Sequence, residues 1–240
     1  MTFAWLVGFV ATALGIGIGG GIAWFFKGFR KSIAAIYALC GGLIVGLICF
    51  EIAPEAVRLG DGFVFILGLV TGVILFKLLH STFHRNLVHS GAHQKETFLH
   101  TGYLLALGIA LHNLPMGIIL GTTSHSLIGT SILHTLVLHN IPEGIILFTP
   151  LFMVGLSVAR FLSVLVGVSF PVAVGVFIGS VFEVDNPMVL AFFISLTIGT
   201  ILMITVEEIF TESIKQSSVM FCLLIALMGS TLIGIYFNII

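Results

Sequence analysis

Eight long apolar stretches divide the sequence and constrain its fold more than any other feature. They cover roughly residues 3–26, 33–53, 62–80, 98–121, 127–151, 159–182, 188–209 and 217–239. Each is close to the length of about 20 residues that a helix needs to cross a bilayer. Only helices and closed barrels satisfy the backbone in lipid, and these stretches are too long for barrel strands. The sequence therefore predicts an all-α integral membrane protein, an eight-transmembrane-helix bundle forming one domain over residues 1–240.

Charge supports this interpretation, because only 8% of the residues are charged and 58% are hydrophobic. A soluble domain carries roughly 25% charged residues, so most of this surface is expected to face a lipid bilayer. The net charge of −1 gives no indication of a nucleic-acid partner. The three cysteines lie in apolar stretches without the spacing of a disulfide framework or a cysteine-type zinc site. The first stretch lacks a basic leader and is too long for a signal segment, so we expect it to be retained.

Basic residues predict the orientation of the helices. Alternating loops place eight of them on one side and only Arg58 on the other, a strong positive-inside signal. The eight are Lys27, Arg30, Lys31, Lys77, Arg85, Lys95, Arg160 and Lys215. We therefore expect both termini to be extracytoplasmic, in a multi-pass protein of the cell (plasma) membrane, with a cytoplasmic loop over residues 81–97.

Two nearly identical segments occupy the middle of the fourth and fifth stretches. They read LHNLPMGIIL over residues 111–120 and LHNIPEGIIL over residues 138–147. Polar side chains at this depth are costly, so they are functional candidates. Residues four apart share a helix face, which places His139 with Glu143 and His112 with Met116.

Each segment also contains a proline, which cannot donate a backbone hydrogen bond. Pro115 and Pro142 should bend their helices and free the carbonyls of Leu111 and Leu138. If the helices face each other, they enclose two imidazoles, a carboxylate, two amides and a thioether. This donor set suits zinc, iron, cobalt or nickel, whereas calcium and magnesium require more oxygen ligands. Histidine and asparagine can also simply bond neighbouring helices, but two repeated units on consecutive helices favour a metal site.

These segments resemble the fourth and fifth helices of the ZIP (Zrt/Irt-like) family of metal transporters. The resemblance implies eight spans, external termini and a histidine-bearing cytoplasmic loop. It also implies inward movement of divalent zinc, iron, manganese or cadmium, by an elevator-like alternating access of one helix bundle against the other. Many members of the family hold two metal ions between the fourth and fifth helices.

The resemblance assigns specific positions to the metal site. The metal positions are His112, Asn113, Met116, His139, Asn140 and Glu143. Family members commonly carry an acid where Met116 stands, and an acid often precedes the proline of the sixth stretch, where this chain has Phe170. Asn140 likewise replaces an acid found in some members. We therefore expect one occupied metal site rather than two.

Other candidates lie along the pathway. We expect Glu51 near the outer entrance and Glu207 near the cytoplasmic exit. We expect Glu208 to be solvated. His84, His89 and His93 suggest weak metal collection by the loop, although a mobile polar loop is an equal alternative.

Competing functions make different demands on the sequence. An intramembrane metalloenzyme needs a positioned general base, yet there is no H-E-x-x-H motif and Asn follows both histidines of the pair. A metal sensor without flux and a transporter of another substrate stay as further alternatives. We expect no enzymatic activity and no cofactor besides the transported ion. A homodimer is the oligomer that we consider, because glycine-rich faces permit tight helix packing within or between chains.

Overall fold

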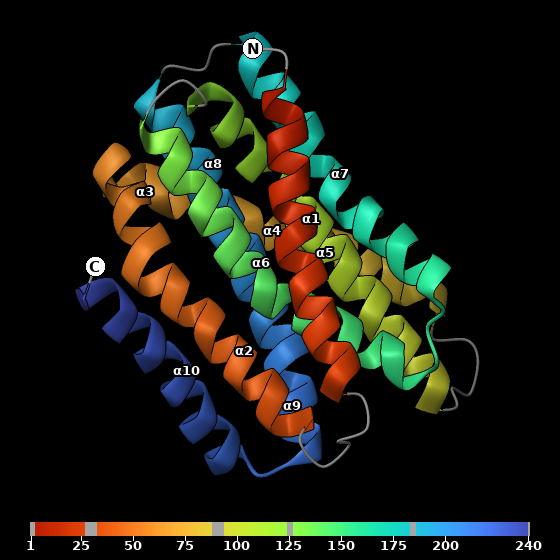
Figure 1. The fold of residues 1–240 in the computed structure, drawn as a ribbon. Helices are drawn as coiled ribbons and strands as arrows, with labels where there is room; N and C mark the ends of the chain where they lie inside the picture. The colour runs from red at the N-terminus through yellow and green to blue at the C-terminus, as the bar shows by residue number, and fades with distance from the viewer. Residues whose placement is uncertain (1–2, 27–32, 88–93, 124–126, 183–185, 240) are drawn as a thin grey trace.

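The structure is a computed structural model, and it describes residues 3–26, 33–87, 94–123, 127–182 and 186–239. All regular elements in these ranges are helical (Figure 1). They are α1 (Ala4–Phe26), α2 (Ile33–Leu47), η2 (Ile48–Ile52), α3 (Ala53–Leu59), α4 (Gly62–Leu87), α5 (Gln94–Thr123), α6 (Leu127–Met153), α7 (Val158–Phe182), α8 (Pro187–Ile204), η3 (Thr205–Phe210), α9 (Thr211–Gln216) and α10 (Val219–Ile239).

The helices confirm the prediction of an all-α membrane bundle. Seven spans are long and apolar enough to cross a bilayer, and a shorter apolar segment, Gly62–Leu78, lies in α4. Two of the spans are composite, because α2, η2 and α3 follow one another without a break, as do α8, η3 and α9. The two η segments are π-helices, which insert an extra residue into a helical turn and often occur at functional positions. Nothing in the hydrophobic pattern predicts them.

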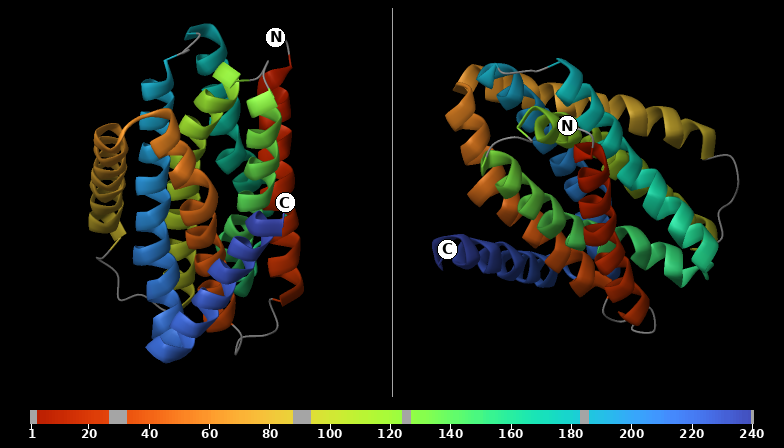
Figure 2. Two further views of the ribbon diagram at one scale, coloured as in Figure 1. Left: turned by 90° about the vertical axis from the view of Figure 1, so that its left-hand side faces the viewer. Right: turned by 45° about the horizontal axis from the view of Figure 1, so that its top comes forward.

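The helices pack as two groups. In the first helix group, α5 packs along α7, α1 packs along α6, and α1 also contacts α7. In the second helix group, α4 packs along α8, and α2 packs along α10 and against α9. The groups meet where α5 contacts α8 and where α2 contacts α6. Figure 2 shows α1 and α4 at opposite edges of the bundle.

Glycines allow the closest of these contacts. A side chain at Gly19 in α1 would collide with the carbonyl oxygen of Ile141 in α6, and one at Gly72 in α4 would collide with the carbonyl oxygen of Leu196 in α8. Small residues permit such backbone approach in membrane helices. In the described residues, the glycine-rich segment of α1 is therefore used for packing within the chain.

One expected loop is partly helical. We predicted a loop over residues 81–97, but α4 continues to Leu87 and α5 begins at Gln94. A helix that is already formed extends cheaply by one residue at a time, so its polar continuation stays helical beyond the apolar stretch. The hydrophobic pattern indicates the length of the apolar segment, which is shorter than the helix that contains it.

Candidate metal centre

Three side chains of the paired motifs meet between α5 and α6. One ligand atom from each of His112, His139 and Glu143 lies within 4.8 Å of the others. Nε2 of His112 is 3.3 Å from Oε1 of Glu143, and the centres of the two imidazole rings are 6.0 Å apart. The predicted convergence of the two motifs on one point is therefore observed.

The local sequence explains this placement. His139 and Glu143 are four residues apart on α6 and so share a face. The glycine of each motif lies against a different neighbour, because Gly117 touches the backbone of Val172 in α7 and Gly144 touches that of Ile16 in α1. Both α5 and α6 stay helical through Pro115 and Pro142.

The three side chains are almost completely buried. The exposed fraction is 0% for His112 and 3% each for His139 and Glu143. Oε2 of Glu143 is buried without a hydrogen bond among the described residues, and each imidazole has only a weak contact with its own helix backbone four residues earlier, His112 with Gly108 and His139 with Thr135. More than about 90% of buried polar groups in proteins are bonded, and a missing bond costs roughly 1–3 kcal/mol. A bound cation would satisfy the ring nitrogens and the carboxylate oxygen together.

The two asparagines each use one end of the amide for structure. Nδ2 of Asn113 donates to the carbonyl of Val168 in α7 at 2.7 Å, and Nδ2 of Asn140 donates to the carbonyl of Leu136 at 2.6 Å. The amide oxygens of both are buried without a hydrogen bond among the described residues. These bonds fix the orientation of both amides.

The remaining positions differ in orientation. Met116 is buried in the core of the bundle. Phe170 is 58% exposed and so points away from the core, whereas its neighbour Ser169 is fully buried with an unbonded hydroxyl. In this part of α7, the side chain that turns inward is therefore Ser169, which the sequence reasoning had not considered.

Glu51 lies in η2, where its carboxylate contacts the first helix group. Oε1 of Glu51 accepts a hydrogen bond from Thr135 in α6, and Oε2 is buried without a hydrogen bond among the described residues. Thr135 is four residues before His139, so it shares that helix face. The sequence reasoning did not identify Thr135, because nothing in the pattern places α2 against α6.

At the other end of the bundle, the acidic residue with a described ion-pair partner is Glu208, and not its neighbour Glu207. Its Oε1 is 3.1 Å from Nε2 of His80 in α4, while Glu207 lies beside it in η3. Glu208 was expected to be solvated, but its side chain is only 11% exposed. The π-helix changes the direction of side chains in this turn, and regular helical spacing does not anticipate that change.

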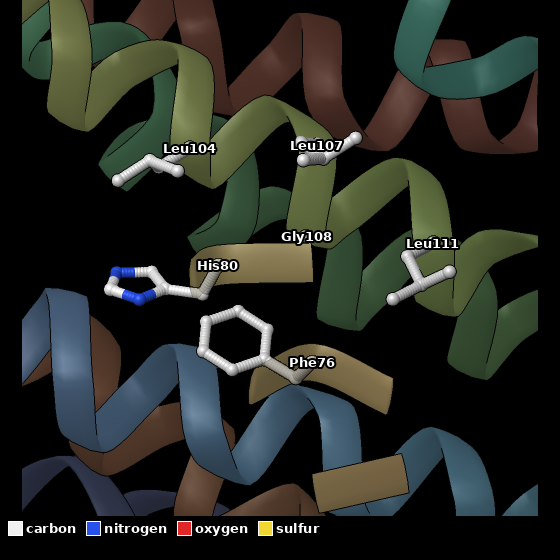
Figure 3. Close-up of a pocket in the computed structure, with 6 residues that line it drawn as sticks. All are labelled: Phe76, His80, Leu104, Leu107, Gly108 and Leu111. Carbon is white, nitrogen blue, oxygen red and sulfur yellow. The ribbon is translucent and has the colours of Figure 1, made fainter. Parts of the chain in front are cut away.

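A small pocket lies beside His80, between α4 and α5. Its walls come from Phe76 and His80 on α4 and from four residues of α5, namely Leu104, Leu107, Gly108 and Leu111. Figure 3 shows the ring of His80 beside that of Phe76, facing the leucines of α5. One lining residue, Leu111, directly precedes His112 in α5.

The predicted loop histidines lie at the limit of the structure. His84 falls within α4, but its side chain is outside the described residues. His89 and His93 lie outside the described residues altogether. Metal collection by these residues stays a prediction.

The fold and the site define a class of protein. A multi-pass helical bundle with two imidazoles and a carboxylate buried at mid-membrane is typical of proteins that handle transition-metal ions. The family model of the ZIP zinc transporters matches residues 79–236, more than half of the 240-residue chain. The chain therefore belongs to the ZIP zinc transporter family, whose members transport divalent metal ions and are not enzymes. A comparison with curated proteins finds no match.

Proposed function

We propose that this chain carries divalent transition-metal ions, zinc foremost, across the cell membrane into the cytoplasm. Iron, manganese and cadmium are the other candidate cargoes. The observation that carries the proposal is the buried cluster of His112, His139 and Glu143, whose ligand atoms lie within 4.8 Å of one another. The ZIP family membership supports the same conclusion.

The geometry of the cluster suits a four-coordinate ion. With metal–ligand distances of about 2.0–2.1 Å, ligand atoms in a tetrahedral zinc site are about 3.3 Å apart. The distance between Nε2 of His112 and Oε1 of Glu143 already equals 3.3 Å. A small rotation of His139 completes three protein ligands, and an amide oxygen of Asn113 or Asn140, the thioether of Met116 or a water supplies the fourth.

One ion per chain fits the donors best. Two neutral imidazoles and one carboxylate carry a charge of −1, which a single divalent cation exceeds by one. A second divalent ion beside it needs further anionic ligands. Apart from the cluster, the unbonded buried side-chain oxygens of the described residues belong to neutral side chains, with one exception. The exception is Glu51, whose other carboxylate oxygen already accepts a hydrogen bond from Thr135. Met116 offers only a soft thioether, which favours zinc over manganese.

The division into two helix groups supports alternating access. The metal centre lies within the first helix group, between α5 and α6, and that group meets the second through α5–α8 and α2–α6 contacts. We propose that the first group moves relative to the second and carries the ion. The ion passes Glu51 on the outer side, and on the inner side it passes Glu207, Glu208 and the pocket beside His80.

We further propose that both termini are extracytoplasmic and that the histidine-bearing segment is cytoplasmic. The proposed oligomer is a homodimer. Charge distribution supports the orientation, since eight of nine basic residues are expected on one side. Gly15, Gly19 and Gly20 of α1 pack within the chain, so these three glycines give the homodimer no support.

Metal uptake into proteoliposomes tests this function. Zinc, iron(II), manganese and cadmium are compared with the wild type and with His139→Ala and Glu143→Ala variants that insert normally. Saturable uptake that both substitutions abolish supports the proposal. Metal binding at the cluster without uptake of any ion identifies a sensor instead, and undiminished flux in both variants refutes the assigned site.

A further inference from the structure

Two hydrogen bonds join the two helix groups near the metal centre. Thr135 in α6 donates to Oε1 of Glu51 in η2. Tyr37 in α2 donates to the carbonyl oxygen of Ile146 in α6 over 3.5 Å. Figure 1 shows α2 and α6 side by side, in agreement with their contacts. Each bond therefore links the helix that carries His139 and Glu143 to the second helix group.

The two bonds lie on opposite sides of the ligands. Along α6, Thr135 precedes His139 by one helical turn, and Ile146 follows Glu143 by nearly one turn. Their partners lie on one composite span, Tyr37 in the first turns of α2 and Glu51 in η2, which follows α2. At 1.5 Å per residue, Tyr37 and Glu51 are about 21 Å apart along the helix. An ion held by the ligands is therefore bracketed by these contacts.

The sequence makes the Tyr37 contact possible through a proline. Pro150 lies inside α6 and has no N–H to offer the carbonyl of Ile146, four residues earlier. A buried carbonyl without a partner is costly. Tyr37 is 1% exposed, and its hydroxyl reaches this carbonyl from the second helix group.

A π-helix accompanies the Glu51 contact. Glu51 lies within η2, and the extra residue of a π-helix changes the direction in which nearby side chains point. One carboxylate oxygen of Glu51 meets Thr135, and the other is buried without a hydrogen bond among the described residues. The π-helical turn therefore occurs at the point where the second helix group contacts the first.

We propose that these bonds are the two gates of the metal centre. The Thr135–Glu51 bond closes the side on which α3 lies, and the Tyr37–Ile146 bond closes the side on which α2 begins. This inference rests on the alternating access of the proposed function. The ligands are at most 3% exposed, so both gates are closed in this structure. The ion leaves to one side only after the bond on that side breaks.

The strength of each bond sets the expected effect. A hydrogen bond of ordinary net strength changes an equilibrium by about two- to twelvefold. The Tyr37 bond is long at 3.5 Å, so its loss should speed release of the ion by about twofold. The Thr135 bond ends on a carboxylate and belongs to a stronger class, so its loss should speed release by more than about tenfold.

The test measures release of bound zinc to each side of the membrane. Radioactive zinc is bound to the protein in right-side-out and inside-out membrane vesicles, and a membrane-impermeant chelator is then added outside. Thr135→Val should speed release only toward the α3 side, and Tyr37→Phe only toward the side where α2 begins. Thr135→Ser keeps the hydroxyl and should release zinc as slowly as the wild type.

A matched control lies in the same helix. Thr149→Val removes a buried hydroxyl that bonds the carbonyl of Ile145 in α6 itself, at 2.6 Å, and it should leave both release rates unchanged. Wild-type release rates in both Thr135→Val and Tyr37→Phe overturn the proposal. So does equal acceleration toward both sides, which indicates general loosening of the bundle.

Equilibrium zinc binding separates this proposal from the proposed function. If Glu143→Gln loses zinc binding while the Thr135 and Tyr37 variants release zinc like the wild type, the gates are refuted and the metal centre stands. If Glu143→Gln binds zinc normally, the metal centre is refuted, and with it the gates that bracket it.

Discussion

Replacing Glu143 by glutamine should abolish zinc binding while leaving the fold intact. Glutamine has nearly the same shape, but it removes the only carboxylate of the cluster and with it the negative charge that faces the ion. Changes to groups that merely support a metal ligand weaken metal affinity by about 10–100-fold. Loss of a ligand should therefore exceed about 100-fold, which corresponds to more than about 2.7 kcal/mol.

Glu143→Gln should not lower the stability of the metal-free protein, although it abolishes zinc binding. In the absence of metal, Glu143 is a buried carboxyl group with one oxygen unbonded among the described residues, and such a group is costly in either protonation state. The variant should therefore be at least as stable as the wild type without metal. Zinc at 100 times its Kd stabilises the wild type by about 2.7 kcal/mol, and the variant should lose this gain.

Calorimetric titration with zinc and thermal unfolding with and without zinc measure both effects. Glu55→Gln is the matched control, because Glu55 is a partly exposed carboxylate that pairs with Arg58 within α3, away from the cluster. The control should bind zinc like the wild type. Unchanged zinc affinity in Glu143→Gln refutes the assignment of this residue as a ligand, and collapse of the metal-free variant refutes the stability argument.

Three further predictions follow from the same geometry. Zinc uptake should fall as the pH decreases, because the ion requires neutral imidazoles and an ionised carboxylate and protons compete with it for all three groups; flux that is independent of pH contradicts ligation by titratable side chains. Met116→Glu should raise the bound zinc from one to two ions per chain in elemental analysis, since it supplies the missing anionic ligand; an unchanged ratio rejects this explanation of the single site. Gly144→Val should lower the melting temperature by forcing α1 away from α6, at a cost of at least about 1–3 kcal/mol. Gly21→Ala should not lower it, because a side chain at Gly21 meets nothing within 4 Å. Equal stability of both variants contradicts the packing.

The paired motifs allowed much of the metal centre to be predicted from the sequence. Helical spacing alone places His139 and Glu143 on one face, and the structure brings His112 to them across the contact between α5 and α6. The same motifs gave no direction for Phe170, which faces outward while Ser169 faces inward. Position relative to a proline does not fix which side of a helix a residue occupies when the neighbouring helices are unknown.

The pathway residues were harder to predict for a specific physical reason. Both acidic positions lie in π-helices, which shift the register of the following side chains. Regular helical geometry therefore could not distinguish Glu207 from Glu208, and the structure pairs Glu208 with His80. The contact between Thr135 and Glu51 depends on helices that are far apart in the sequence, and no local pattern records it.

X-ray absorption spectroscopy of the zinc-loaded protein tests the central claim most directly. The account predicts one zinc ion per chain, two imidazole nitrogens in the first coordination shell and light-atom ligands at about 2.0–2.1 Å. In His139→Ala the signal should retain a single imidazole if any zinc stays bound. A wild-type spectrum with two or more sulfur ligands, or with no imidazole, contradicts a metal centre built from His112, His139 and Glu143.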